Sequence, residues 1–415
     1  MAEQRPRLLV IMGSGETSPT MSKVHREVFA RLGSGEVPAA MLDTPFGFQE
    51  NADDIVAKAV DYFRESVRRP VAVASYRSSD EIGSVEHETS LARLREAGWV
   101  FAGPGSPSHA LRRWRESGVP AVLAEKLRTG GSITFASAAA VTLGPYALPV
   151  YEIYKVGETP FWLDGLDLMA DVGLRAVVIP HFNNAEGGNH DTRYCYMGER
   201  RLRMLEDALP DDVFVLGVDE HTACVLDLDS GRASVAGLGC VTVRVRGVVV
   251  RQVSAGESVG IRCLAEVGGQ AVLPAAEVVT PTAAMSRSPL QDELARQERT
   301  FEQAVGERDA KTATQCILEL DDLLVEWSRD TLQSDEMDRA RAALRSMIVR
   351  LGEAADEGLR DPREVVEPLV EALLDARRDA RDGRRWSDAD AIRDRLVDAG
   401  IEVRDTPDGT EWQVG

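Results

Sequence analysis

Residues 130–144 read GGSITFASAAAVTLG, a short apolar run that ends at Ser137 and continues into a run of small residues. Ser132–Ala136 is typical of a buried strand, because parallel strands covered on both faces read as continuous apolar stretches. The alanines that follow favour a helix that packs closely against the strand. Such a turn exposes its central side chain beside the helix amides, so Ser137 is a candidate nucleophile. The alternative is an ordinary N-cap serine.

Further apolar runs of strand length alternate with helical patterns on both sides of this stretch. The predicted strands are Leu8–Met12, Val37–Leu42, Val71–Ser75, Trp99–Ala102 and Ala176–Ile179, and the helices include Glu50–Ser66, Glu86–Ala97 and Ser108–Ser117. This alternation predicts an α/β fold, a mostly parallel sheet flanked by helices. After residue 211, closely spaced strands with Gly and Asp turns predict antiparallel edge strands.

The rest of the chain predicts a linker and a C-terminal α-helical domain. Residues 266–290 mix Gly, Pro, Ser and Thr without a period, which is typical of a linker. Helical patterns follow, and the terminal GIEVRDTPDGTEWQV predicts a hairpin about Pro407–Gly409. The predicted helices are Asp292–Leu332, Asp335–Glu357 and Pro362–Ala399, the last with Ser387, Asp388 or Asp390 as candidate breaks. The predicted parts are therefore an α/β domain (1–265), the linker, a helical region (291–362) and a terminal module (363–415).

Composition narrows the class of protein. The net charge of −20 repels phosphate backbones and anionic membranes, which disfavours a general nucleic-acid binder. Five cysteines without CxxC spacing indicate reduced thiols in a cytoplasm. No stretch approaches the ~20 apolar residues of a membrane span, and the N-terminus indicates a strand and a glycine turn rather than a signal peptide. A cytoplasmic protein is expected; its oligomeric state stays open, with a homodimer as one option.

Other strand ends supply candidate partners for Ser137. His181 follows a predicted strand in VVIPHFNN, where open α/β sheets place ligands, and could act as general base. Glycine loops after two further strands allow a ligand to approach the backbone closely. These loops are MGSGE, with Gly13, Gly15 and Glu16, and AGPGSP, with Gly103 and Gly105. Each feature taken alone also fits a structural role.

Two polar loops add candidate substrate contacts. In residues 183–202 these are Glu186, His190, Asp191 and Arg193, and in residues 43–54 they are Phe46, Phe48 and Gln49. Arg193 suits a substrate carboxylate, because a guanidinium binds carboxylates bidentately. Glu186, His190 and Asp191 have no established metal-ligand spacing with His181, so neither a metal nor another cofactor is predicted. The alternatives are a solvated loop and simple loop packing.

Residues 1–260 resemble the cyanophycinase and aspartyl dipeptidase family of serine peptidases, within the class I glutamine amidotransferase-like fold. Five pieces match in the same order: MGSGE, AGPGSP, FASAAAVTLG, IPHF and GVDEHTACVLD, the last like the family's G-[IV]-D-E-x-T-A run near Asp219, Glu220 and Thr222. The resemblance implies a nucleophile at Ser137, a base at His181 and an acid between them in sequence. Glu158 and Glu152 are the candidates for that acid, with Glu158 preferred.

The resemblance leaves two functions open. A serine hydrolase would cleave a peptide or isopeptide bond of a small peptide-like substrate, with backbone amides of Ala138 and Gly103 or Gly105 holding the oxyanion. However, the family elbow reads G-x-S-A-G-A, whereas residues 135–140 of this chain read FASAAA, with Ser137 between Ala136 and Ala138. Both glycines of the family elbow are therefore replaced. Alanine costs ~1 kcal/mol there, or more where φ must be positive. The alternative is therefore an inactive or weakened domain that acts as a binding or regulatory protein.

The stretch between Trp386 and Trp412 is similar to the extreme C-terminus of cysteinyl-tRNA synthetases. The matching pieces are WSDADAIRDRL and GIEVRDTPDGTEW. Because that region lies near the tRNA anticodon end, the resemblance implies tRNA or a protein as a partner. The catalytic signatures of a synthetase are absent from the sequence, so aminoacylation is not implied. The basic run Arg377–Arg385 could touch phosphate; the alternative is a salt-bridged helix with both tryptophans in the core.

Overall fold

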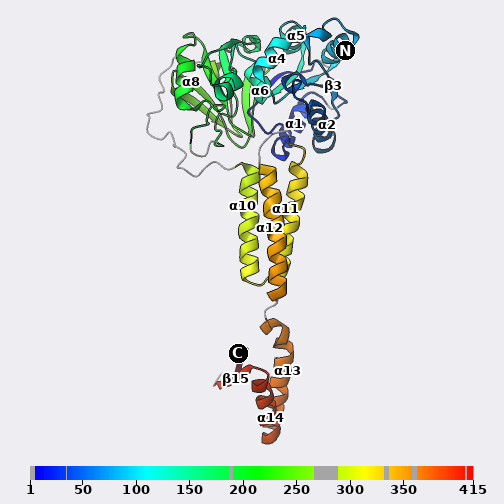
Figure 1. Ribbon diagram of the computed structural model, residues 1–415, viewed down its shortest axis with the longest axis vertical. Coiled ribbons are helices and arrows are strands. Elements are labelled where there is room, and N and C mark those ends of the chain that lie inside the picture. Colours follow the sequence, from blue (N-terminus) through cyan, green and yellow to red (C-terminus); the bar gives the residue numbers. More distant parts are fainter. Residues whose placement is uncertain are drawn as a thin grey trace. The chain divides into compact units, whose positions relative to one another are not determined.

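The computed structural model describes residues 5–33, 35–186, 190–265, 288–330, 336–357, 362–406 and 409–414. The chain divides into two compact units, which Figure 1 colours along the sequence. Unit 1 comprises Met1–Ser288 and Val325–Ser334, and unit 2 comprises Pro289–Leu324 and Asp335–Gly415. Residues 266–287, most of the predicted linker, lie outside the described residues.

The larger sheet of unit 1 has eight strands with a parallel half and an antiparallel half. In spatial order they are β14 (Ser258–Gly260), β11 (Arg232–Gly237), β10 (Thr222–Asp227), β1 (Arg7–Met12), β5 (Gly131–Ala136), β4 (Trp99–Ala102), β2 (Ala39–Leu42) and β3 (Ala72–Ala74). All pairs from β1 to β3 are parallel, whereas β10, β11 and β14 join antiparallel. The parallel strands therefore end at one edge, where their following loops meet.

A smaller, four-stranded sheet holds the rest of the α/β domain. Its strands are, in order, β13 (Val248–Ser254), β12 (Cys240–Val245), β9 (Phe214–Val218) and β8 (Ala176–Ile179). The predicted fold class is confirmed: a mostly parallel sheet flanked by helices, with antiparallel strands beside it. Strand β9 pairs antiparallel with β12, as predicted, but it also pairs in parallel with β8, where Ile179 faces Gly217. An apolar run identifies a strand but carries no information about its partner or direction.

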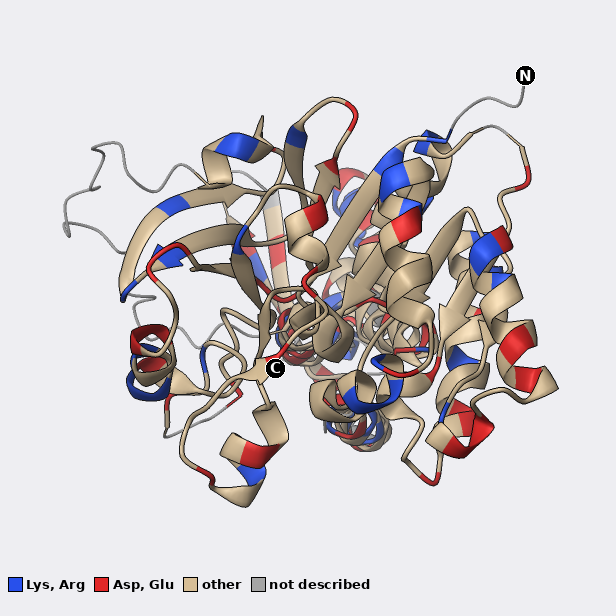
Figure 2. Ribbon diagram, turned by 90° about the horizontal axis from the view of Figure 1, so that it is seen from above, with Lys and Arg blue, Asp and Glu red and all other residues tan. Residues whose placement is uncertain are grey.

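Strand β1 is buried on both faces by helices. Leu8, Val10 and Met12 pack into a cluster with α1 (Pro19–Arg31) and α2 (Ala52–Tyr62), while Leu9 and Ile11 pack on the opposite face. The helices of that second face are α3 (Val85–Glu96), α4 (Pro107–Trp114), α5 (Val119–Thr129), α6 (Ser137–Val141) and α7 (Leu168–Asp171). Two further helices of unit 1 are α8 (Gly198–Asp207) and α9 (Ile261–Ala265). In Figure 2 acidic and basic positions are interspersed along the outer helices of unit 1.

Unit 2 begins with α10 (Pro289–Gly306), α11 (Ala310–Trp327) and α12 (Glu336–Glu357). Phe301, Leu320 and Met347, one from each helix, share a hydrophobic core. The predicted single helix Asp292–Leu332 is wrong, because Asp309 starts a second helix by accepting the backbone N–H groups of Lys311 and Thr312. No helix in the described ranges is both long and apolar enough to cross a membrane.

The chain ends in α13 (Pro362–Asp382), α14 (Trp386–Asp398) and a hairpin of β15 (Ile401–Thr406) and β16 (Gly409–Val414). The break between the helices falls at residues 383–385 and not at Ser387, Asp388 or Asp390. Arg384 adopts a left-handed φ of 57° there, which stops helix propagation. The predicted hairpin is confirmed, although Pro407 and Asp408 of its turn lie outside the described residues.

Candidate functional site

Ser137 lies at a sharp turn between β5 and α6. Its φ is 48°, in the left-handed region, whereas Ala136 before it is extended with φ −125° and ψ 153°. A left-handed residue other than glycine costs of order 1–3 kcal/mol and persists only where its surroundings enforce it. The surrounding alanines do not have positive φ, so replacement of the family glycines adds no backbone strain at those positions. The strained residue is the serine itself.

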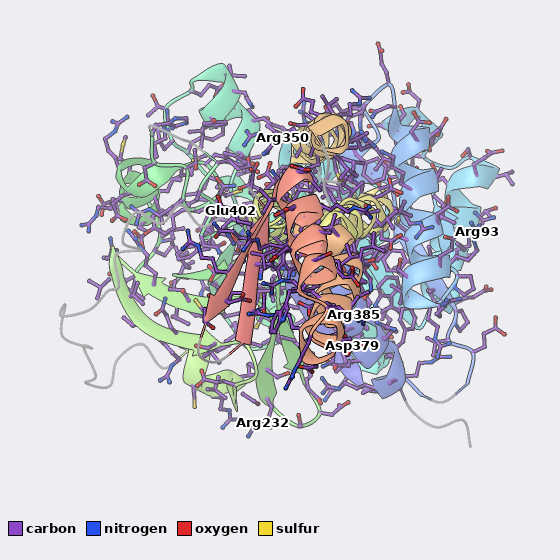
Figure 3. The ribbon with its side chains drawn as sticks, turned by 90° about the horizontal axis from the view of Figure 1, so that it is seen from below. Arg93, Arg232, Arg350, Asp379, Arg385 and Glu402 are labelled. Atoms are coloured by element: carbon purple, nitrogen blue, oxygen red, sulfur yellow. The ribbon has the colours of Figure 1, made fainter. Side chains whose placement is uncertain are left out.

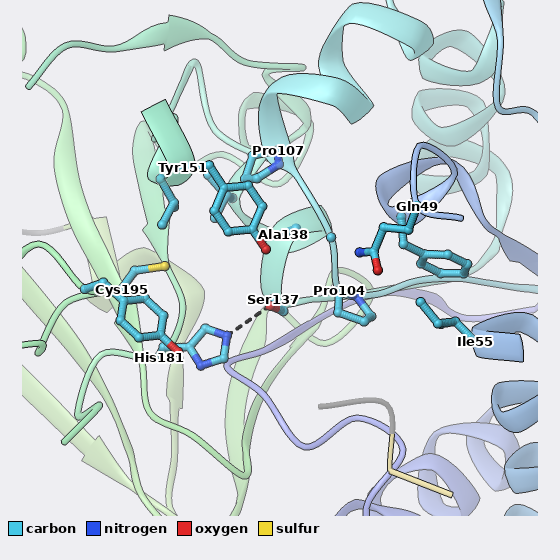
Figure 4. A pocket seen from close by; sticks show the side chains of 14 residues that line it. Gln49, Ile55, Pro104, Pro107, Ser137, Ala138, Tyr151, His181 and Cys195 are labelled. Atoms are coloured by element: carbon cyan, nitrogen blue, oxygen red, sulfur yellow. Dashed lines mark hydrogen bonds between the residues drawn. The ribbon is translucent and has the colours of Figure 1, made fainter. Parts of the chain in front are cut away.

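The structure brings Ser137 and His181 together. The Ser137 hydroxyl lies 2.9 Å from His181 Nε2 (Figure 4), and His181 Nδ1 lies 2.9 Å from Glu220 Oε1. His181 follows β8 and Glu220 follows β9, and these strands are parallel neighbours, so the residues after their carboxyl ends meet. With its proton on Nδ1, the imidazole donates to Glu220 and accepts from the serine.

The acid beside the histidine is Glu220, which corrects the expectation of Glu158 or Glu152. Glu158 is exposed beyond the π-helical turn Glu152–Val156, and Glu152 begins that turn. Two asparagines hold Glu220. Asn184 Nδ2 donates to Glu220 Oε1 at 3.1 Å, and the Glu220 backbone N–H donates to Asn183 Oδ1 at 2.8 Å. The sequence signal for Glu220 was the D-E-x-T-A run directly after an apolar strand.

Burial and charge set the protonation of the pair. Burial of the His181 ring lowers its pKa, but the hydrogen bond and charge of Glu220 outweigh burial and raise the pKa above its ordinary value. Burial raises the pKa of Glu220, but the hydrogen bond and charge of His181 outweigh that effect and lower it. Glu220 is therefore ionised when His181 begins to take up a proton.

Ser137 and His181 face a cavity of about 150 Å³ (Figure 4). Four other predicted site residues line it: Ala138, Gly105, Phe46 and Gln49. The sequence did not indicate the remaining wall residues, which are Ile55, Pro104, Pro107, Val141, Val150, Tyr151, Cys195 and Tyr196. Gly103 lies beside the turn, where its carbonyl accepts the Ala139 backbone N–H at 3.2 Å. Phe48 is instead exposed and packs on the His109 ring.

The MGSGE loop supports the site from behind and does not line the cavity. A Cβ on Gly13 would lie 2.0 Å from the Asp219 carbonyl, so only glycine allows β1 to end this close to the Glu220 segment. Gly15 packs against the His221 ring in the same way. The Glu16 carboxyl is fully buried beside Gly103, and burial raises its pKa to about 7. These positions correct the expectation that Gly13, Gly15 and Glu16 contact substrate.

In the loop after His181, Asp191 and Arg193 pair with each other, and neither lines the cavity. Asp191 accepts from Arg193 Nε at 2.9 Å and from Arg193 Nη2 at 2.8 Å, and these bonds lower the pKa of Asp191 to about 2. Glu186 accepts from the Tyr196 hydroxyl at 2.9 Å, and His190 is exposed. Arg193 does not line the cavity, and two of its donors, on Nε and Nη2, are engaged by Asp191. Across the described ranges, no group of three or more His, Cys, Asp or Glu side chains could hold a metal ion.

One buried arginine links α13 to β15 in the terminal module, beside a hydrophobic cluster that includes Leu374, Leu396 and Trp412. Arg377 donates through both terminal nitrogens to Asp405, each at 2.8 Å, and Arg381 joins the same carboxylate. Trp412 is 8% exposed and donates to Glu371, whereas Trp386 is 58% exposed. The prediction of a core tryptophan is thus confirmed for Trp412 and wrong for Trp386. Asp379 on α13, Arg385 before α14 and Glu402 on β15 are labelled in Figure 3.

Comparison with known proteins assigns this module. Residues 365–412 match the cysteinyl-tRNA ligase anticodon binding domain. The chain is also 34% identical over 102 residues to a cysteine–tRNA ligase of Streptomyces coelicolor, an alignment that covers 22% of this chain and 17% of that protein. This chain therefore spans less than a fifth of that relative.

Solved structures that this chain is similar to include a peptidase and a putative peptidase. A peptidase from an acI-B1 actinobacterium aligns with a TM-score of 0.50 and 19% identity, over 62% of this chain and 98% of the other. The α/β domain thus has a peptidase fold. A putative peptidase E protein from Listeria monocytogenes aligns over 56% of this chain and 100% of the other, at 14% identity and a TM-score of 0.38.

Proposed function

We propose that the α/β domain is a serine hydrolase of a peptide or isopeptide bond, with Ser137, His181 and Glu220 as its triad. The supporting observation is the unbroken line of two 2.9 Å contacts from the serine hydroxyl through the imidazole to the carboxylate. Nucleophile, base and orienting acid in this order define the chemistry on many folds. The five free cysteines fit the cytoplasmic location that forms part of this proposal.

The proposed reaction follows from this line of contacts. Ser137 Oγ attacks the substrate carbonyl while its proton passes to His181 Nε2, and Glu220 stabilises the resulting imidazolium. The backbone N–H of Ala138, in the first turn of α6, and an amide of Gly103 or Gly105 hold the oxyanion. His181 then protonates the leaving amine. In the second half of the reaction, His181 takes a proton from water, which attacks the acyl group, and returns the proton to the leaving Ser137 oxygen.

A fluorophosphonate probe tests the proposal directly. We expect wild-type protein to be labelled, with the mass increase on the peptide that contains Ser137, and we expect Ser137→Ala to remain unlabelled. A label that persists in Ser137→Ala, or that maps to another residue, contradicts the mechanism. An unlabelled wild type instead favours the non-catalytic alternative, a domain that binds a ligand in the same cavity.

Hydrolysis should fall as the pH is lowered through the pKa of His181. Only the neutral imidazole accepts the serine proton, and Glu220 raises this pKa above its ordinary 6.5. The midpoint of kcat/KM against pH should therefore lie above 6.5 in wild type and should move down in Glu220→Gln, which lacks the raising charge. A midpoint that is the same in both proteins would exclude this coupling.

A second candidate function is tRNA binding by the terminal module. Trp386 supports it, because an exposed indole at the start of α14 offers a surface on which a nucleotide base can stack. The basic run contributes less than the sequence suggested, since Arg377 and Arg381 are engaged with Asp405. The observation therefore favours recognition through stacking more than through charge.

Filter binding of unmodified tRNA to the full chain measures this function. Loss of one stacked base costs ~1–3 kcal/mol, so Trp386→Ala should weaken tRNA binding about tenfold or more. Val397→Ala, at another exposed apolar position of α14, serves as the control and should leave binding unchanged. Absence of tRNA retention by wild type at low salt would rule the function out.

A further inference from the structure

We propose that the cavity beside Ser137 selects an uncharged, apolar substrate group and rejects a carboxylate. This inference rests on the proposed function, because it names the substrate class of the same serine. It follows from the chemistry of the cavity wall, from the position of the one arginine in the neighbouring loop, and from the charges around the histidine.

The described wall of the cavity carries no guanidinium, ammonium or carboxylate. Its apolar part consists of Phe46, Ile55, Val141, Val150 and two prolines, Pro104 and Pro107. Its polar part is neutral and is formed chiefly by Gln49, Tyr151 and Tyr196 (Figure 4). The volume of about 150 Å³ accommodates one branched or aromatic group. A carboxylate in this space would lose its hydration without gaining a guanidinium or ammonium partner from the described wall.

The loop after His181 contains Arg193, the side chain that could supply a cation, and a tight turn fixes the backbone of this loop. Tyr194, Cys195 and Tyr196 have φ values of 60°, 55° and 67°, three left-handed residues in succession. The turn is anchored on the strand end, since the Cys195 backbone N–H donates to the His181 carbonyl and the Tyr194 backbone N–H to the Phe182 carbonyl. It presents the side chains of Cys195 and Tyr196 to the cavity.

Arg193, just before this turn, does not line the cavity. Its guanidinium is held by Asp191 and lies 5.0 Å from the centroid of the Tyr194 ring. Asp191 also accepts the backbone N–H of Glu199 at the start of α8, which fixes the pair to a helix. This bidentate ion pair restrains the Arg193 guanidinium at a position where it does not line the cavity.

The charges nearest the histidine disfavour an anionic substrate as well. Glu220 contacts the His181 ring, and Glu186 lies behind Tyr196, whose hydroxyl donates to it. Both carboxylates sit on the side of the cavity that holds the base. An incoming carboxylate would meet repulsion from them in a partly desolvated space, where such interactions are stronger than in water.

Two esters of matched shape test the selection. The probes are p-nitrophenyl 5-methylhexanoate and mono-p-nitrophenyl glutarate, whose acyl chains end in an isopropyl group or in a carboxylate of the same outline. With the Ser137→Ala rate subtracted as background, kcat/KM for the neutral ester should be on the order of 100-fold higher. Equal rates, or a preference for the glutarate ester, would overturn the inference.

Two substitutions show which residue sets the selection. Gln49→Arg places a cation on the cavity wall and should narrow the ratio between the two esters at least tenfold. Arg193→Gln serves as its matched control and should leave the ratio within twofold of wild type. If Arg193→Gln instead selectively reduces glutarate hydrolysis, the arginine reaches the substrate and the inference is wrong.

Fluorophosphonate labelling separates this inference from the proposed function. Labelled wild type that prefers the acidic ester contradicts the inference alone. Unlabelled wild type removes the proposed function and the inference with it. If Ser137 is labelled but turns over neither ester, the two esters are compared as competitors of labelling; the neutral one should protect at lower concentration, and equal protection overturns the inference.

Discussion

Glu220→Gln is expected to lower kcat/KM by ~10³–10⁴-fold while fluorophosphonate still reaches Ser137 slowly. The glutamine keeps the size of the side chain but removes the charge that stabilises the imidazolium during proton transfer. It also replaces an acceptor of two hydrogen bonds, from His181 Nδ1 and Asn184 Nδ2, by a group that can donate to the ring and fix the wrong tautomer. Steady-state kinetics on the neutral ester measure the loss.

Glu158→Gln and Glu152→Gln are the matched controls for this experiment. Neither side chain contacts His181, so each variant should retain kcat/KM within about twofold of wild type. A loss in Glu158→Gln as large as that in Glu220→Gln would show that the acid is the one implied by the sequence order. The two variants together therefore decide whether the acid is Glu220, as the geometry indicates, or Glu158, as the resemblance implies.

Arg244→Met is expected to destabilise the smaller sheet of unit 1 by ~3–5 kcal/mol, because it leaves a buried carboxylate without its cation. The Arg244 side chain is 3% exposed and the Glu206 side chain 2%. Arg244 Nε and Nη2 donate to Glu206 at 3.0–3.1 Å, and Nη1 and Nη2 donate to Glu199 at 2.9 and 2.8 Å. These bonds lower the pKa of Glu199 to about 2.

Hydrogen exchange of peptides from β12, read by mass spectrometry on the whole chain, measures this loss. Arg244→Met should reduce the protection of β12 by ~10²-fold or more. Arg246→Met, which removes an ion pair with the exposed Asp211, should change the free energy of local opening at β12 by less than ~1 kcal/mol. Adding Glu206→Gln to Arg244→Met should recover part of the protection; no recovery would mean that lost packing, and not the unpaired charge, causes the effect.

The sequence located Ser137 and His181 because each directly follows an apolar run that could be recognised as a strand. It did not locate Glu220 as the acid, although the residue stood in a quoted motif. Strand β9 was interpreted as an antiparallel edge, and the carboxyl ends of antiparallel neighbours do not meet. Only the parallel pairing of β8 with β9 brings Glu220 to the ring.

For Arg193 and Trp386 as well, the sequence did not predict the partner or the burial of the individual side chain. A guanidinium near a strand end could bind a carboxylate of the substrate or of the protein, and in the structure Arg193 binds Asp191. Trp386 and Trp412 occur in one motif with equal apolar character. Trp412 is buried by hairpin pairing onto α13, while Trp386 begins a helix after a left-handed break and stays in solvent.

The sequence by itself determined the class of fold, the order of its elements and the two strand ends that carry the serine and the histidine. These properties depend on local periodicity and on the residue types at turns, which are written within a few neighbouring positions. The tertiary structure alone decided which acid meets the imidazole, which way Arg193 points and how apolar the cavity is. Those outcomes depend on strand pairing and packing between segments far apart in the chain, which no local pattern encodes.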